Sequence, residues 1–177
     1  AGVSLLPAVG FDVVPSDWFA WTPTDVKCDP IPSGGTCTAT FVNSKKVYVK
    51  ACKLEDVDKT PTSAADRAPV AGGTVELTKS GVVVDTKTTG ADGCYTWTNL
   101  DPLPPANHYD AHEVVPADWY AWTPIDVICA PIASGGTCTA TFVNSEKVKV
   151  TACKVEDMDG VAATDADREP IEGWDVY

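Results

Sequence analysis

The chain lacks the features on which several protein classes depend. No apolar run approaches the 18 residues of a membrane-spanning helix, and the start AGVSLLPAVG has neither the charged region nor the apolar length of a signal peptide. The chain is therefore expected to be a mature or excised segment. Basic residues are scarce, since 13 Lys and Arg stand against 25 Asp and Glu and the net charge is −12. This charge opposes contact with nucleic acid or anionic lipid, so we expect neither a nucleic-acid partner nor membrane insertion.

Signatures of catalysis are also missing. The sequence has no GxSxG, no HExxH and no phosphate-binding loop, and no Ser or Cys has a plausible His partner in either copy of the repeat described below. It has no CxxC pair and only two histidines, which speaks against a zinc site. His108, Asp110 and His112 alternate and could face one metal, but their repeat equivalents are Pro7, Val9 and Phe11. An exposed strand face is the simpler interpretation, and we expect no enzyme activity.

What the chain has is a long internal repeat. Residues 11–76 match residues 112–177 without a gap at an offset of 101, with 41 of 66 positions identical. DWFAWTPTDVKCDPIPSGGTCTATFVNS recurs as DWYAWTPIDVICAPIASGGTCTATFVNS, and ACKLEDVDKTPTSAADRAPVAG recurs as ACKVEDMDGVAATDADREPIEG. Such a repeat is typical of proteins built as arrays of similar units.

Short strands with frequent turns fill the unit. Val47, Val49 and Ala51 alternate with more polar neighbours, which indicates a half-buried strand, and further strands are expected at TVELTKS, GVVVDTKT, CYTWTNL, HYDAHEVV, WYAWTPIDV and TCTATFVN. No segment of ten or more residues shows a helical period. Seven strands in this pattern predict an all-β fold, an antiparallel, Greek-key-like β-sandwich in tandem copies. We expect a complete sandwich at 45–145, the end of a preceding one at 1–44 and the start of a following one at 146–177.

The seven cysteines favour an oxidising, extracellular setting. Cys28 with Cys37, and Cys129 with Cys138, bracket equivalent short loops between expected neighbouring strands, so each pair could close. Cys52 and Cys94 are then the remaining pair of the central unit. Cys153 repeats Cys52, and its partner would lie beyond Tyr177, so it is expected to be unpaired within this segment. Bonding to another subunit and buried free thiols are the alternatives.

Several motifs in the unit resemble a known family. KLEDVD with RAPVAGGTVEL, then TTGADGCYTWTNLDP, YDAHEVVPADW and TCTATFVNSEK are similar, in this order, to B-type repeats of bacterial serine-aspartate-repeat surface proteins and collagen-adhesin B-type domains. The resemblance implies a prealbumin-like or immunoglobulin-like sandwich and a tandem array on a cell surface, in which domains act as stiff spacers in stalks or fibres.

The acidic loop offers candidate metal ligands. Calcium takes six to eight oxygens at flexible geometry, which alternating carboxylates can supply. Val161, Ala162 and Arg168 occupy positions where an EF-hand needs a ligand, glycine and glutamate, so the loop is not an EF-hand. The alternative is a solvated acidic turn. The candidate ligands are Asp56, Asp58 and Asp66 in one copy and Asp157, Asp159, Asp165 and Asp167 in the other.

The resemblance also implies a covalent cross-link, because collagen-adhesin B-type domains often carry a Lys–Asn isopeptide promoted by a buried Glu. The matching residues are Lys53, Glu113 and Asn144. Lys53 shares a strand face with Val47, and Glu113 shares one with Tyr109, so both could face the core. A buried acid could shuttle the proton. The alternative is a lysine whose ammonium group reaches solvent at a strand end.

Two functions follow as hypotheses. The first is a structural subunit or segment of an extracellular surface fibre, built from disulfide-bonded sandwiches that are completed across chains or along a longer polypeptide. Its partners would be copies of itself or adjacent repeats. The second is an adhesin that binds a host protein or glycan through Trp119 and Trp122, which repeat Trp18 and Trp21. Core filling or contact with the next unit is the simpler account of these aromatics.

Overall fold

The computed structural model describes residues 8–29, 31, 33–60, 62–158 and 168–170, and every element in them is a β-strand. The chain divides into two units, Ala1–Glu146 and Lys147–Tyr177. Within the described residues, no helix is long and apolar enough to cross a membrane. The expected all-β fold is therefore present.

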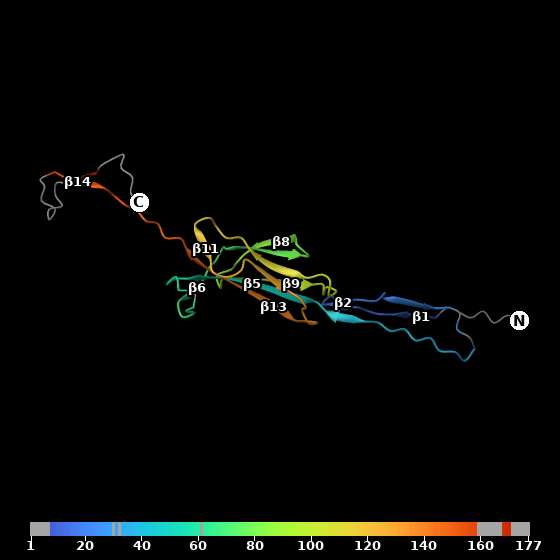
Figure 1. The fold of residues 1–177 in the computed structure, drawn as a ribbon. Helices are drawn as coiled ribbons and strands as arrows, with labels where there is room; N and C mark the ends of the chain where they lie inside the picture. Colours follow the sequence, from blue (N-terminus) through green and yellow to red (C-terminus); the bar gives the residue numbers. More distant parts are fainter. Residues whose placement is uncertain (1–7, 30, 32, 61, 159–167, 171–177) are drawn as a thin grey trace. The chain divides into compact units, whose positions relative to one another are not determined.

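Residues 47–146, which we call the central sandwich, form two sheets (Figure 1). One sheet has four strands in the order β12 (Asp126–Cys129), β10 (Tyr109–Glu113), β7 (Thr74–Lys79) and β8 (Val82–Thr88). The other has five, in the order β11 (Trp119–Ala121), β13 (Thr137–Glu146), β5 (Val47–Asp56) and β6 (Arg67–Pro69), with β9 (Cys94–Leu100) also paired to β5. Ser80 and Gly81, with φ of 51° and 81°, make the tight turn between β7 and β8, for which two left-handed residues fit the strand twist.

The core lies between the two sheets and follows the alternation in the sequence. Val47, Val49 and Ala51 of β5 are buried, as are Tyr109 and Ala111 of β10. Alternate residues of a strand point to the same face. These side chains therefore lie in one core with the inward-facing residues of β7, β9 and β13. The rest of the core cluster consists of Val75, Leu77, Trp97, Cys129, Ala140 and Phe142.

One strand pairing is parallel, although the sequence predicts an antiparallel sandwich. β13 runs parallel to β5 over eight residue pairs, from Thr137 beside Tyr48 to Asn144 beside Glu55. All other pairings in the sandwich are antiparallel. Since the first and last strands run side by side in the same direction, the chain enters this sandwich at one end and leaves it at the other, about 25 Å away at 3.3 Å per residue.

A second difference concerns the segment WYAWTPIDV. The sequence predicts one strand here, but it forms two, β11 and β12, which belong to different sheets. Pro124 lies between them and has no N–H to donate to a ladder. The chain therefore crosses from one sheet to the other at this proline.

Residues 8–45, the N-terminal segment, repeat the last strands of the sandwich. β1 (Ala8–Phe11) pairs with β3 (Asp25–Cys28), and β2 (Trp18–Ala20) pairs with β4 (Asn43–Lys45). These registers equal those of β10 with β12 and β11 with β13 after the shift of 101. The equivalent of most of β13, residues 36–42, forms no strand.

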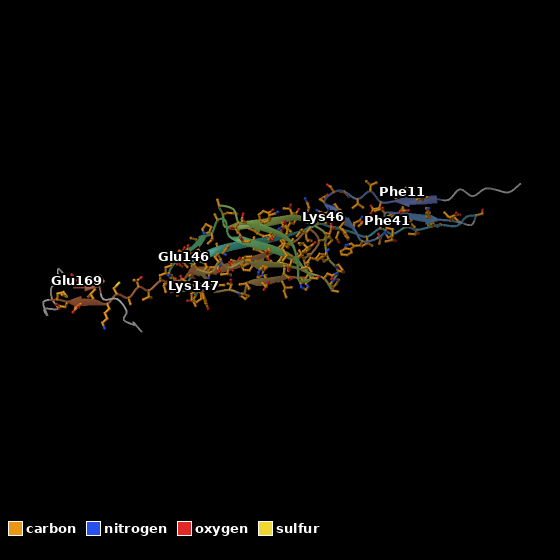
Figure 2. All side chains as sticks on the ribbon, turned by 90° about the horizontal axis from the view of Figure 1, so that it is seen from above. Phe11, Phe41, Lys46, Glu146, Lys147 and Glu169 are labelled. Carbon is orange, nitrogen blue, oxygen red and sulfur yellow. A yellow bond between two sulfur atoms is a disulfide. The ribbon has the colours of Figure 1, made fainter. Side chains whose placement is uncertain are left out.

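The C-terminal segment, described for residues 147–158 and 168–170, repeats the start of the sandwich. β14 (Val155–Asp157) pairs with β15 (Arg168–Pro170) in the register that joins β5 to β6. Residues 147–154, which correspond to most of β5, are exposed and form no strand. In the described residues, one two-sheet sandwich thus lies between Lys46 and Lys147, which Figure 2 labels, with two strand pairs before it in the sequence and one after it.

Candidate cross-link site and acidic loop

Lys53 points into the core of the central sandwich. It lies on β5 on the same face as Val49 and Ala51, and only 1% of its surface is exposed. Its stem passes close to Gly73, where a Cβ atom would come within 2.5 Å of Lys53 Cδ. A side chain at position 73 would therefore displace the lysine.

Glu113 and Asn144 meet this lysine from two other strands. Glu113 on β10 is 1% exposed, and Asn144 on β13 is 0% exposed. Lys53 Nζ lies 2.9 Å from Glu113 Oε1, and Asn144 Nδ2 donates a hydrogen bond of 2.5 Å to the same oxygen. Nζ also donates to the Val114 carbonyl at 3.3 Å. Glu113 therefore contacts both Lys53 and Asn144, the two residues that the family resemblance matches to a cross-link.

The site leaves two oxygens without partners. Neither Glu113 Oε2 nor Asn144 Oδ1 accepts a hydrogen bond, although both are buried. Burying a polar atom without a hydrogen-bond partner costs free energy. If the site were only an ion pair between Lys53 and Glu113, these two oxygens would keep that cost. The free amide oxygen is the atom on which negative charge would develop if an amine attacked Asn144 Cγ.

This geometry suits formation of an amide between Lys53 and Asn144. Glu113 touches both the amine and the leaving nitrogen, so one carboxylate can take protons from Nζ and pass them to Nδ2. The new bond joins Nζ to Cγ, and the Cγ–Nδ2 bond breaks. Nδ2 gains the two protons that Nζ loses and leaves as ammonium, and Glu113 is regenerated. No oxidant or cofactor is needed.

The acidic loop after β5 gathers three carboxylates. Asp56, Asp58 and Asp66 each offer an oxygen, and these oxygens lie within 4.8 Å of one another. Asp66 Oδ2 accepts from the Asp58 backbone N–H at 2.5 Å, and Thr60 N–H donates to Asp56 Oδ1 at 3.0 Å and to Asp58 Oδ1 at 2.7 Å. Asp56 Oδ2 and Asp66 Oδ1 are buried without partners. These two oxygens are suited to a cation, so the donor set fits calcium.

Burial also changes the acidity of this loop. The pKa of Asp56 is raised, first by loss of water around the carboxylate, then by its contact with Asp58 and the negative charge of Asp66, while the Thr60 N–H opposes the shift. Of the equivalent candidates, Asp157 is half-buried. The other three, Asp159, Asp165 and Asp167, lie outside the described residues.

Three disulfides form in the pairs expected from the sequence. They join Cys28 to Cys37, Cys52 to Cys94 and Cys129 to Cys138. Cys52 and Cys94 face each other across the β5–β9 pairing. Cys153 is exposed and has no disulfide partner.

The alternating His108, Asp110 and His112 do not form the exposed face that the sequence suggests. Asp110 is 8% exposed and accepts a hydrogen bond from Thr78 Oγ1 at 2.9 Å, while His112 Nδ1 lies 2.7 Å from Asp126 Oδ1. The interpretation is wrong for Asp110 because β10 is an inner strand, whose side chains contact β7 and β12. His108 Nε2 lies 3.4 Å from Asp110 Oδ1, so the two histidines contact different carboxylates.

Trp122 and Trp21, which directly follow β11 and β2, each hydrogen-bond to the last strand of their copy. Trp122 Nε1 donates to Ser145 Oγ at 2.9 Å, and Ser145 Oγ donates to the Asp56 carbonyl at 2.6 Å. Trp21 Nε1 makes the same bond to Ser44 Oγ at 2.9 Å. Trp122 also packs edge-to-face on Tyr120. These bonds hold the last strand of each copy, and the adhesive role of Trp119 and Trp122 stays a prediction.

Sequence reasoning did not find two contributors to these sites. Gly73 gives Lys53 its path, and the Val114 carbonyl accepts from the lysine. The only signal for Gly73 is the doubled glycine before a strand, and a backbone carbonyl leaves no signal in a sequence.

Comparisons with known proteins find similarity among solved structures alone. No family model matches the chain, and no curated protein matches it. The shaft pilin SpaA of Lactobacillus rhamnosus GG is 17% identical over 59% of this chain and 52% of that one, with a TM-score of 0.41. The minor pilin GBS52 of Streptococcus agalactiae is 12% identical over 73% and 67%, with a TM-score of 0.45. The major pilin SpaD of Corynebacterium diphtheriae is 17% identical over 71% and 34%, with a TM-score of 0.42.

The chain thus spans about half the length of the shaft pilin that it matches. Identities and TM-scores at this level do not place the chain in a family. The resemblance to B-type repeats of serine-aspartate-repeat proteins stays a prediction from the motifs.

Proposed function

We propose that this chain is a structural subunit or segment of an extracellular fibre or stalk, in which sandwiches follow one another end to end. The parallel pairing of β5 with β13 supports the proposal, because it places the entry and exit of the sandwich at opposite ends. Three disulfides, Cys28–Cys37, Cys52–Cys94 and Cys129–Cys138, suit an oxidising, extracellular setting such as a cell surface.

The observation that carries the proposal is the complementarity of the two partial repeats. Val148 and Val150 are 69% and 88% exposed, whereas their equivalents Val47 and Val49 are 1% and 0% exposed in the sandwich core. The N-terminal segment holds the last strands of a unit, and its residues 36–42 lack the first strand beside which β13 runs. We infer that a first strand such as 147–157 completes such a segment, supplied by a neighbouring copy or along a longer polypeptide.

Assembly of the purified chain tests this proposal. Replacing Val148 and Val150 with glutamate puts two charges where the shared core would form, so the variant should stay monomeric near 18.7 kDa in sedimentation velocity while the unaltered chain grows into filaments visible by electron microscopy.

Val82→Glu with Val84→Glu is the matched control, because these valines are also exposed but lie on β8, outside the repeat junction. It should assemble as the unaltered chain does. Filaments from the Val148/Val150 variant, or an unaltered chain that remains monomeric at every concentration, would contradict completion across chains.

Two further properties belong to this proposal. Lys53 and Asn144 are joined covalently, supported by the shared contact with Glu113. Calcium is held by Asp56, Asp58 and Asp66, supported by the two unpartnered carboxylate oxygens. Both would stiffen the sandwich. The covalent bond would join the first strand, β5, to the last strand, β13, and calcium would hold the acidic loop that follows β5.

The calcium proposal predicts a gain in stability that requires Asp56. At a free calcium concentration of about 100 times Kd, binding stabilises the folded state by about 2.7 kcal/mol. Scanning calorimetry should show a higher Tm with calcium for the unaltered chain and no change for Asp56→Asn, while Asp118→Asn, at an exposed position outside the loop, should respond as the unaltered chain does. An equal response from Asp56→Asn would exclude the site.

Without calcium, the same variant should show a distinctive pH dependence. The pKa of Asp56 is raised in the folded state, so its contribution is present at acid pH and is lost as the pH rises through that pKa. Asparagine does not titrate. The Tm of Asp56→Asn relative to the unaltered chain should therefore rise between pH 4 and pH 7 in chelator, and a difference that stays constant or falls would contradict the assignment.

A further inference from the structure

The N-terminal segment contains a second copy of the acid–amide pair found in the central sandwich. Asn43 Nδ2 donates to Asp12 Oδ2 at 2.7 Å, as Asn144 Nδ2 donates to Glu113 Oε1 at 2.5 Å. Asn43 and Asp12 correspond to Asn144 and Glu113 by the shift of 101. Asn43 Oδ1 is buried without a partner, just as Asn144 Oδ1 is.

The backbone around the two pairs is the same. Asp12 N–H donates to the Thr24 carbonyl at 2.9 Å, and Glu113 N–H donates to the Ile125 carbonyl at 2.8 Å. Asn43 lies opposite Ala20, as Asn144 lies opposite Ala121. The backbone pairing around Asp12 and Asn43 is thus the same as that around Glu113 and Asn144, and the shorter aspartate side chain still reaches the amide. The shared geometry indicates that the Asp12–Asn43 contact is part of the repeated fold and not a chance surface contact.

The N-terminal pair lacks the third member of the site. In the central sandwich the amine comes from Lys53 on the first strand, whereas the described residues of 8–45 form only the equivalents of β10, β11, β12 and the end of β13. The same shift maps Lys53 onto Lys154. Lys154 follows Val148, Val150 and Ala152 with the two-residue period that carries Lys53 to the core face of β5.

We propose that Asp12 and Asn43 are the acceptor half of an isopeptide centre that is completed by Lys154 of another copy, so that neighbouring chains become covalently joined. The inference rests on the proposed sharing of a sandwich. Nζ of Lys154 forms a bond to Cγ of Asn43, and the Cγ–Nδ2 bond breaks. Asp12 relays two protons from Nζ to Nδ2, which leaves as ammonium.

Charge and burial both favour this partner. A strand laid beside residues 36–42 in the manner of β5 beside β13 would bring a lysine at the position of Lys53 against Asp12. The ammonium group would neutralise a carboxylate in a site that assembly closes to water, which strengthens the attraction. Position 174 carries Trp where the central unit has Gly73, so Lys154 would reach Asn43 by a different path from the one that Lys53 takes past Gly73.

Lys154→Arg separates assembly from covalent joining. Arginine keeps the positive charge for Asp12 but cannot form the amide. Filaments of the unaltered chain, dissolved by boiling in SDS with reductant, should give a ladder in steps of 18.7 kDa, and each link should lose one ammonia, about 17 Da, in intact mass. Lys154→Arg filaments should dissolve to monomers, while Lys149→Arg, on the same segment, should give the ladder.

Peptide mapping then identifies the lysine bonded to Asn43. Lys154 bonded to Asn43 of a different chain, shown by mixing isotopically light and heavy copies, supports the proposal. The same bond within one chain, or in native material a lysine from outside residues 1–177, overturns the neighbouring copy as its source. Filaments of the unaltered chain that dissolve to monomers overturn the cross-link and leave the proposed function intact. Failure to assemble at all contradicts the proposed function, and this inference with it.

Discussion

Replacing Glu113 with glutamine is expected to abolish the Lys53–Asn144 bond and to lower Tm by at least about 15 °C. The bond would close a loop between positions 91 residues apart, for which chain entropy predicts about 4 to 5 kcal/mol. Each kcal/mol shifts Tm by about 4 to 8 °C in a domain of this size. In the variant, the Lys53 ammonium also stays in the core without its counter-charge, which adds to the loss.

Intact mass after reduction provides the direct measurement. The unaltered chain should weigh about 17 Da less than its sequence for each ammonia lost, and the loss that maps to Asn144 should be absent from Glu113→Gln. Lys53→Met with Glu113→Leu removes both charges, so its lower stability reports the missing bond even if the single variant fails to fold. Lys50→Met, on the other face of β5, is the control and should keep the bond. Peptides containing unmodified Lys53 and Asn144 from the unaltered chain would refute the cross-link.

Removing the Cys52–Cys94 disulfide should cost more stability than removing Cys129–Cys138. The sequence separations are 42 and 9 residues, and loop closure over these lengths corresponds to about 4 and about 2.7 kcal/mol. Cys52 and Cys129 are buried to a similar degree, so double alanine variants lose comparable packing. Urea unfolding at neutral pH measures both.

The order of the two losses is the result that matters. If Cys129→Ala with Cys138→Ala loses as much free energy as Cys52→Ala with Cys94→Ala, loop closure does not set the contribution of these bonds. The exposed Cys153 should be replaced by serine in every variant, since a free thiol could exchange with the disulfides under test.

The family resemblance matched Lys53, Glu113 and Asn144 to one site, and the alternation of polar and apolar residues predicted which strand face two of them occupy. Period-two patterning put Lys53 on the face of Val49 and Glu113 on the face of Ala111, and the structure buries all four. Cys28–Cys37 and Cys129–Cys138 were predicted from equivalent short loops, and Cys52–Cys94 as the pair that remained in the central unit. Register across sheets could not be predicted, however, because nothing local in the sequence states which strand lies beside which. The parallel β5–β13 pairing and the separation of β11 from β12 at Pro124 are consequences of chain topology.

Burial of polar groups was likewise hard to predict. Asp110 looks like a surface residue in sequence, but its hydrogen bond to Thr78 depends on a neighbour 32 positions away. The importance of the Asp12–Asn43 pair was also hidden, because aspartate in place of glutamate suggests a lost site until its contact with Asn43 is seen. The local sequence pattern predicts which face of a strand a side chain lies on, but only the fold shows which residue that side chain contacts.

The parallel pairing of β5 with β13 has a mechanical consequence. Tension along a fibre would pull the first strand and the last strand of each sandwich in opposite directions, which loads their hydrogen bonds in shear, all at once, and not one by one as in unzipping. A bond between Lys53 and Asn144 would carry the pull directly from the first strand to the last. Residues 54–143 would then bear no load, so the sandwich could transmit force without being stretched.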